Sequence, residues 1–195
     1  MKKQLFFVAL AVGLGIIACN DADTSENVGT GDSISNGSMT TDTSGSAVSQ
    51  SAPADSATIL FMTKAASGGT MEVQLGQYAQ DQGQSQRVKD YGAMMVRDHT
   101  KANDELKSIA SAKNVTLSDS LMPEHKKHVT DLQKRKGSAF DKAYMDMMVK
   151  DHQKTIQDFE TASNSLSDGE VKAFATRTLP VLRGHLDSAT AINKK

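Results

Sequence analysis

The chain of 195 residues carries 22 basic and 23 acidic side chains, for a net charge of −1, and contains one cysteine and no tryptophan. This near-neutral balance, with few aromatic residues, argues against a nucleic-acid-binding protein. A single cysteine excludes an intramolecular disulfide and a metal cluster held by thiolates.

The N-terminal segment is basic and then apolar. Two lysines precede an apolar run over residues 5–18, which is shorter than the about 20 residues of a membrane span and is typical of a secretory signal peptide. The run ends in Ile-Ile-Ala-Cys, which resembles a bacterial lipobox, where lipid is attached to the cysteine. We therefore expect residues 1–18 to be removed. Cys19 should then anchor an exported protein to a membrane that faces the periplasm, with the outer membrane favoured.

Residues 19–56 have a different composition. Ser, Thr, Gly and Asp dominate this segment, and it contains no Lys, no Arg and no aromatic residue. Such a segment has too little apolar surface to offset the entropy lost on ordering. We expect a disordered acidic tether.

Residues 57–193 are expected to form one helical domain, because helix-forming residues are frequent and runs of β-branched residues are absent. Four long segments show helical periodicity, and a shorter one precedes the third: 57–82, 86–113, 123–135, 138–164 and 168–193. Short links within the first and last pairs favour an antiparallel four-helix bundle with an extra short helix. Ser138 and Ser167 are placed to begin capping boxes, and Pro180 should bend the last helix.

One hexapeptide occurs twice, as MMVRDH and, 53 residues later, as MMVKDH. Each copy places its histidine, His99 or His152, on the apolar stripe of its helix. The same periodicity places Glu72 on the stripe of the first long segment and His185 on that of the last. Each long helix therefore directs one potential metal ligand toward the core.

Two interpretations of these four residues remain open. Buried polar groups can be hydrogen-bonded to one another without a metal. Alternatively, three histidines and one glutamate suit a single Zn, Fe, Mn or Cu ion. Asp98 and Asp151, each beside a stripe histidine, either orient a neighbouring histidine or lie exposed, and we slightly favour exposure. His125 and His128 lie among charged residues and are expected to be solvated.

Several short motifs occur in combination: a Gly-Gly pair before Glu72, the two Asp-His pairs, and a Leu-Pro pair before His185. Together they resemble the bacterial ferritin-like family known as domain of unknown function 4142, over about residues 57–190. The resemblance implies an exported, often lipid-anchored helical bundle, and it implies no settled function. Ferritin-like di-iron centres use Glu-x-x-His on two helices. The residues three before the histidines are Val96, Val149 and Leu182, so we expect no di-iron centre.

Two classes of function are compatible with these features. The first is a non-enzymatic envelope lipoprotein whose bundle binds a metal or a partner, for example in stress protection. The second is a metalloenzyme with one open metal centre made of His and Glu. The sequence has no nucleophile motif, P-loop, dinucleotide fingerprint or haem-attachment pair. An open coordination position would distinguish the enzyme, because a substrate needs access, whereas a closed site with four ligands is structural. We favour the first class. The membrane, through Cys19, is the one partner that the sequence indicates.

Overall fold

The computed structural model describes residues 53–194, so the expected signal peptide, Cys19 and most of the expected tether lie outside the described residues. The described part is all-α, as the composition predicted. Its helices are α1 (Ser56–Gln82), α2 (Gln86–Ala112), α3 (Pro123–Gln133), α4 (Gly137–Ser165) and α5 (Gly169–Asn193). These bounds differ from the expected ones by at most two residues. None of the described helices is long and apolar enough to span a membrane.

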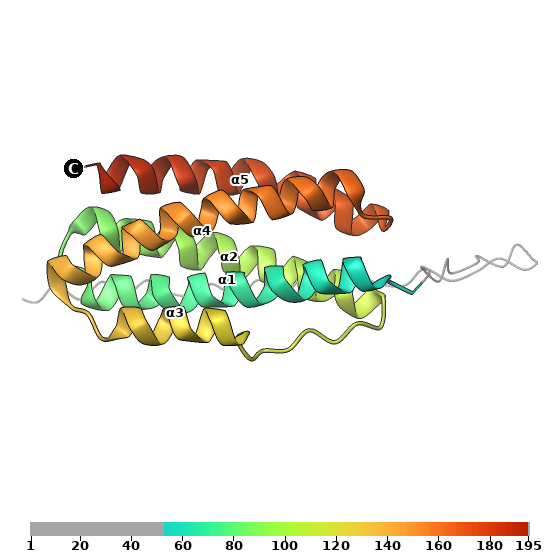
Figure 1. The fold of residues 1–195 in the computed structure, drawn as a ribbon, viewed down its shortest axis with the longest axis horizontal. Helices are drawn as coiled ribbons and strands as arrows, with labels where there is room; N and C mark the ends of the chain where they lie inside the picture. Colours follow the sequence, from blue (N-terminus) through green and yellow to red (C-terminus); the bar gives the residue numbers. More distant parts are fainter. Residues whose placement is uncertain (1–52, 195) are drawn as a thin grey trace, which may run out of the picture. The chain divides into compact units, whose positions relative to one another are not determined.

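The long helices form two hairpins, α1 with α2 and α4 with α5, and the hairpins pack through α2 with α5 and α1 with α4. The chain between the hairpins returns along the bundle, and its helix α3 lies against α1 (Figure 1). This return makes α2 and α4 run in the same direction on opposite sides of the bundle. The two helices that carry the repeated hexapeptide are therefore related by an approximate twofold rotation about the bundle axis.

The helix caps differ from those expected. The carboxylate of Asp168 accepts two backbone N–H bonds at the start of α5, at 3.1 and 3.0 Å, so Ser167 is not the cap. Ser138 lies inside α4, which begins without a side-chain cap. Asp141 instead accepts backbone N–H bonds from Gln84 and Ser85, at 3.0 and 2.7 Å. The capping box expected to begin at Ser138 was therefore wrong. The carboxylate of Asp141 binds the open turn between α1 and α2 instead, because this turn offers two unpaired N–H donors.

Two glycines bring α1 and α2 close together. A Cβ atom added to Gly76 would lie 2.6 Å from the carbonyl oxygen of Gly92, and one added to Gly92 would lie 2.6 Å from the carbonyl oxygen of Gly76. In the second copy of the repeat, Met145 takes the place of Gly92. The two copies therefore diverge at a position where α2 closely approaches α1, about two turns before His99.

Replacing Gly92 by alanine should lower the free energy of unfolding by about 1–3 kcal/mol, because the new methyl group meets backbone that cannot move aside locally. Gly184→Ala is the matched control, since a Cβ there meets nothing within 4 Å and the residue is exposed. That control should raise stability by up to about 1 kcal/mol through helix propensity. Urea denaturation measures both changes, and equal effects would contradict the close approach.

A polar layer divides the apolar core into two clusters. On every long helix, apolar residues on one side of the layer belong to the first cluster and those on the other side to the second. The first cluster includes Met62, Leu106, Phe159 and Phe174, and the second includes Met71, Met95, Met148 and Ala189. The layer between them contains Glu72, His99, His152 and His185, all buried. The four stripe residues therefore lie at one level of the bundle.

Candidate metal centre

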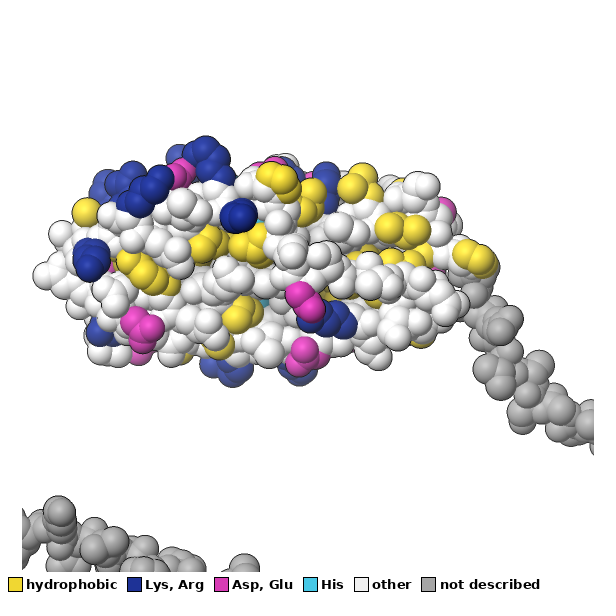
Figure 2. Space-filling view, turned by 90° about the horizontal axis from the view of Figure 1, so that it is seen from below, with side chains coloured by type: hydrophobic (Ala, Val, Ile, Leu, Met, Phe, Trp, Pro, Cys, Tyr) yellow, Lys and Arg dark blue, Asp and Glu magenta, His cyan; other side chains and the backbone are white. Residues whose placement is uncertain are grey.

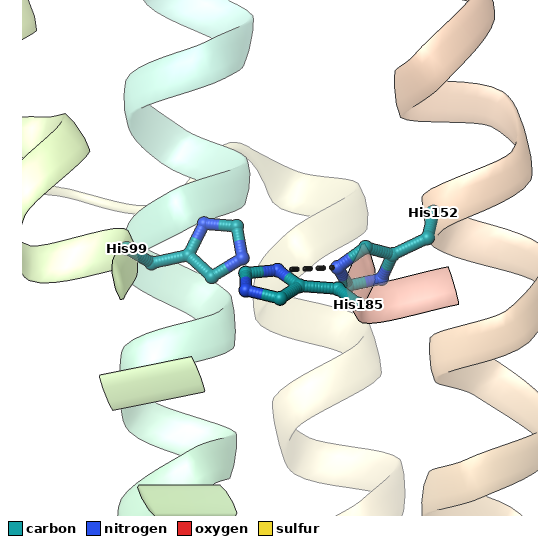
Figure 3. A group of neighbouring side chains, drawn as sticks. All are labelled: His99, His152 and His185. Atoms are coloured by element: carbon teal, nitrogen blue, oxygen red, sulfur yellow. Dashed lines mark hydrogen bonds between the residues drawn. The ribbon is translucent and has the colours of Figure 1, made fainter. Parts of the chain in front are cut away.

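Three histidines from three helices converge in the polar layer. His99 of α2, His152 of α4 and His185 of α5 point toward one another (Figure 3). One ring nitrogen of each lies within 4.8 Å of the corresponding atom of the other two. The Nε2 atom of His152 lies 3.3 Å from Nδ1 of His185. Three of the four predicted ligands therefore form one compact group.

The other ring nitrogen of each histidine faces an oxygen atom. His99 Nδ1 lies 3.1 Å from a carboxylate oxygen of Glu72, and His185 Nε2 lies 3.0 Å from one of Asp98. His152 Nδ1 lies 3.0 Å from the backbone carbonyl oxygen of Met148. The Met148 carbonyl and the ionised Asp98 carboxylate can only accept, so His152 Nδ1 and His185 Nε2 carry the protons. This assignment leaves His152 and His185 each with an unprotonated nitrogen directed at the centre of the group. Because burial raises the pKa of Glu72, His99 Nδ1 and the Glu72 carboxyl group share one proton between them.

The inward nitrogens of His152 and His185 have no proton to share at neutral pH. Burial is the main cause that lowers the pKa of all three histidines, and it lowers the pKa of His152 to about 4. The neutral rings of His152 and His185 therefore direct two lone pairs at each other across 3.3 Å. His99 Nε2 is buried without a hydrogen-bond partner. Two nitrogens bound to one tetrahedral ion at about 2.0–2.1 Å are about 3.3 Å apart, so the group fits a cation.

Glu72 belongs to a second, overlapping group. Its carboxyl group, that of Asp151 and a ring nitrogen of His152 lie within 4.8 Å of one another. Burial and then the charge of Asp151 raise the pKa of Glu72 well above its usual range. One oxygen of Glu72 is 3.4 Å from His152 Nδ1, but that nitrogen directs its proton to the Met148 carbonyl instead. The structure thus places the four predicted ligands in two groups, with the three histidines in one and Glu72 in the other.

A comparison with known families identifies this bundle. The model of the family DUF4142, described as a domain of unknown function, matches residues 43–192. The chain belongs to this family. It is also similar to the crystal structure of a DUF305 fragment from Deinococcus radiodurans, with a TM-score of 0.64 and 13% identity, over 73% of this chain and 98% of that one. At such low identity the likeness shows the fold alone. No curated protein matches the chain.

The two aspartates of the repeat reach different partners in this DUF4142 domain. Asp98 of α2 contacts His185 on α5, the helix beside it, so it orients a neighbouring histidine rather than lying exposed. Asp151 of α4 meets Glu72 on α1, the helix in the equivalent position, and is partly buried. The approximate twofold rotation thus relates an Asp–His pair to an Asp–Glu pair. The sequence repeat predicts the aspartates but not this difference between their partners.

The histidines of α3 are only partly as expected. His128 is exposed, but the side chain of His125 is only 12% exposed, and its Nδ1 lies 2.7 Å from the hydroxyl oxygen of Ser67. The expectation that His125 is solvated was therefore wrong, because α3 packs this side of its helix against α1.

The sequence did not predict that the Met148 carbonyl holds the ring of His152. Every residue has a carbonyl, and no sequence signal marks this one.

A cavity of 140 Å³ reaches the centre of the DUF4142 domain from the side of α3. Glu72, His99 and Asp151 border it within the bundle, and His125 and His128 border it on α3. Figure 2 views the face on which α3 lies, where acidic and basic side chains are scattered without a dominant patch of either sign. The cavity gives water and small ions a space beside the buried residues.

Proposed function

We propose that the protein is a cell-envelope lipoprotein whose helical bundle holds one divalent metal ion on His99, His152 and His185. One observation carries the metal site. Each of the three buried rings turns one nitrogen toward a common centre, while an oxygen atom lies beside its outer nitrogen. Metal-bound histidines usually donate their second N–H group to a carboxylate or a backbone carbonyl, and such partners fix ring orientation and increase ligand basicity.

The arrangement of the long helices supports a ferritin-like bundle. One long connection, which contains α3, joins two helical hairpins and makes α2 and α4 run in the same direction. A single long crossover of this kind is a feature of ferritin-like folds. We infer that the bundle uses this topology to bring one inward histidine from each repeat to a shared centre.

The donor atoms suggest which ions bind. Three neutral imidazoles suit zinc, copper and iron, whereas manganese prefers carboxylate and water ligands. Zinc needs no change of oxidation state and accepts tetrahedral geometry with three histidines and one further ligand. We therefore propose Zn²⁺, Cu²⁺ or Fe²⁺ as the ion on the three histidines, with Glu72 and Asp98 holding the rings rather than binding that ion.

The full chain, purified without a histidine tag, should bind one Zn²⁺ ion per molecule, measured by equilibrium dialysis and elemental analysis. His185→Gln should weaken this binding at least tenfold, because it removes one of the three ligands. The matched control is His128→Gln, which changes an exposed histidine beside the cavity and should leave zinc affinity unchanged. Equal zinc binding by the wild type and His185→Gln would rule out this site.

The lipid anchor is an independent part of the proposal. The basic and apolar N-terminal segment, followed by Ile-Ile-Ala-Cys, supports lipid attachment at Cys19. Cys19→Ala should move the protein from the membrane fraction to the soluble fraction after cell lysis, and labelled fatty acid should enter only the wild type. A variant that stays in the membrane fraction, with no label in the wild type, would refute the anchor.

A metalloenzyme with an open coordination position is the second candidate. The observation in its favour is the 140 Å³ cavity that borders His99, because an ion with three protein ligands can take a substrate or water from such a space. Azide binding to the Cu²⁺-loaded protein, seen as a shift of its visible absorption, would favour this candidate over a closed binding site.

A further inference from the structure

We propose that the protein binds a second cation, a hard divalent ion such as Mn²⁺ or Mg²⁺, between the carboxylates of Glu72 and Asp151. This site lies beside Nδ1 of His99, on the side of that ring that faces away from the centre of the three histidines. It goes beyond the proposed function, which places one ion on imidazole nitrogens, and it does not depend on that ion.

The pairing of the two repeat aspartates carries the argument. Asp98 meets an N–H donor, the Nε2 atom of His185 at 3.0 Å, so that pair satisfies itself. The equivalent aspartate, Asp151, meets the carboxyl group of Glu72, and a carboxylate oxygen of each lies within 4.8 Å of the other. Ionised carboxylates only accept hydrogen bonds. Two ionised carboxylates this close repel each other, so a proton or a metal ion between them would stabilise the pair.

His99 Nδ1 contacts one oxygen of Glu72 at 3.1 Å, and the other donors near this pair are engaged elsewhere. The Nδ1 proton of His152 goes to the Met148 carbonyl at 3.0 Å. The ammonium group of Lys154, which borders the same cavity, pairs with Asp158 at 2.6 Å. Glu72 is 2% exposed, and its Oε1 atom has no hydrogen-bond partner. A buried acceptor without a donor is costly, and this one belongs to the group that it forms with Asp151 and His152.

The adjoining space suits a hydrated ion. The cavity of 140 Å³ borders both Glu72 and Asp151 and far exceeds the about 15 Å³ that one water molecule requires. Mg²⁺ and similar ions keep several water ligands and bind proteins through one or two carboxylates. Two carboxylates also match the charge of a divalent ion. The remaining charged side chains at the cavity are Lys64, Glu124 and Asp158, which are exposed, and Lys154, which is paired.

Mn²⁺ tests this site, because free Mn²⁺ in solution gives a paramagnetic resonance signal that disappears on binding. The full chain is first given one equivalent of Zn²⁺ to occupy nitrogen ligands, and Mn²⁺ is then titrated. The wild type should bind one Mn²⁺ ion per molecule, whereas Asp151→Asn and Glu72→Gln should each bind it at least tenfold more weakly. Glu124→Gln is the matched control, since this acid borders the same cavity but is exposed, and the substitution leaves the Lys154–Asp158 pair intact.

Circular dichroism checks that each variant is folded. Because the two substitutions lie on different helices, one variant still tests the site if the other does not fold. If the wild type binds no Mn²⁺, or if both variants bind it as tightly as the wild type, the second site is overturned and the two carboxyl groups share a proton. Zinc binding without Mn²⁺ binding would leave the proposed function intact. Mn²⁺ binding without zinc binding would leave only the second site.

Discussion

Replacing His152 by alanine should lower the free energy of unfolding of the metal-free protein by about 2–5 kcal/mol. The side chain is fully buried, so its removal leaves a cavity between the two apolar clusters. The substitution also removes the hydrogen bond that His152 Nδ1 donates to the Met148 carbonyl oxygen at 3.0 Å, where water cannot easily replace it.

Urea denaturation at pH 7.5, with a chelator present, measures this effect without any contribution from bound metal. His128→Ala is the control, because this histidine is exposed and a surface substitution usually changes stability by less than about 0.5 kcal/mol. The same pair of variants should differ even more when metal is added, since only His128→Ala can gain stability from binding. Equal stabilities of the two variants would show that His152 is not held as the structure places it.

The metal-free protein should also lose stability as the pH falls from 6.5 to 5. Burial lowers the pKa of His152 to about 4 in the folded state, whereas an unfolded histidine has a pKa of about 6.5. Between these values the unfolded chain binds more protons than the folded one, so acid favours unfolding. A shift of this size corresponds to about 3 kcal/mol once the pH reaches 4, and burial shifts His99 and His185 in the same direction.

Glu72 should act in the opposite sense. Its pKa is raised in the folded state, mainly by burial and then by the charge of Asp151, so the stability that it contributes is present at low pH and is lost as the pH rises. Unfolding midpoints in urea between pH 5 and 9, with chelator, test both slopes. His152→Gln should flatten the acid side, and Glu72→Gln should flatten the alkaline side. A wild-type profile without either slope would contradict the burial of these groups.

The helices and the polar layer were predictable because both depend on local periodicity. A 3.6-residue repeat of apolar residues set the helix bounds, and the same repeat placed Glu72, His99, His152 and His185 on inward faces. The depth at which each residue lies depends only on short turns within each hairpin. Sequence spacing alone was therefore enough to indicate that each hairpin brings its two polar groups together.

The division of the site into two groups was not predictable, because it depends on how one hairpin sits against the other. The connection through α3 helps to set that position, and its sequence shows no periodic pattern from which the height of α4 relative to α1 could be predicted. The same uncertainty hid the contact between Asp98 and His185. It also hid the role of Asp141, whose local sequence fits a capping box but whose side chain reaches another turn of the chain.

The separation of the apolar core by a polar layer bears on how cooperatively the protein opens. Each end of the bundle has its own cluster of buried apolar residues, so each can behave as a separate unit of local unfolding. Strong interactions across the layer depend on the histidines, because apolar contacts stop there. An ion held by α2, α4 and α5 would join both ends into one unit. Amide hydrogen exchange should then be slow at both ends of the bundle, whereas we expect the two ends of the metal-free chain to exchange at different rates.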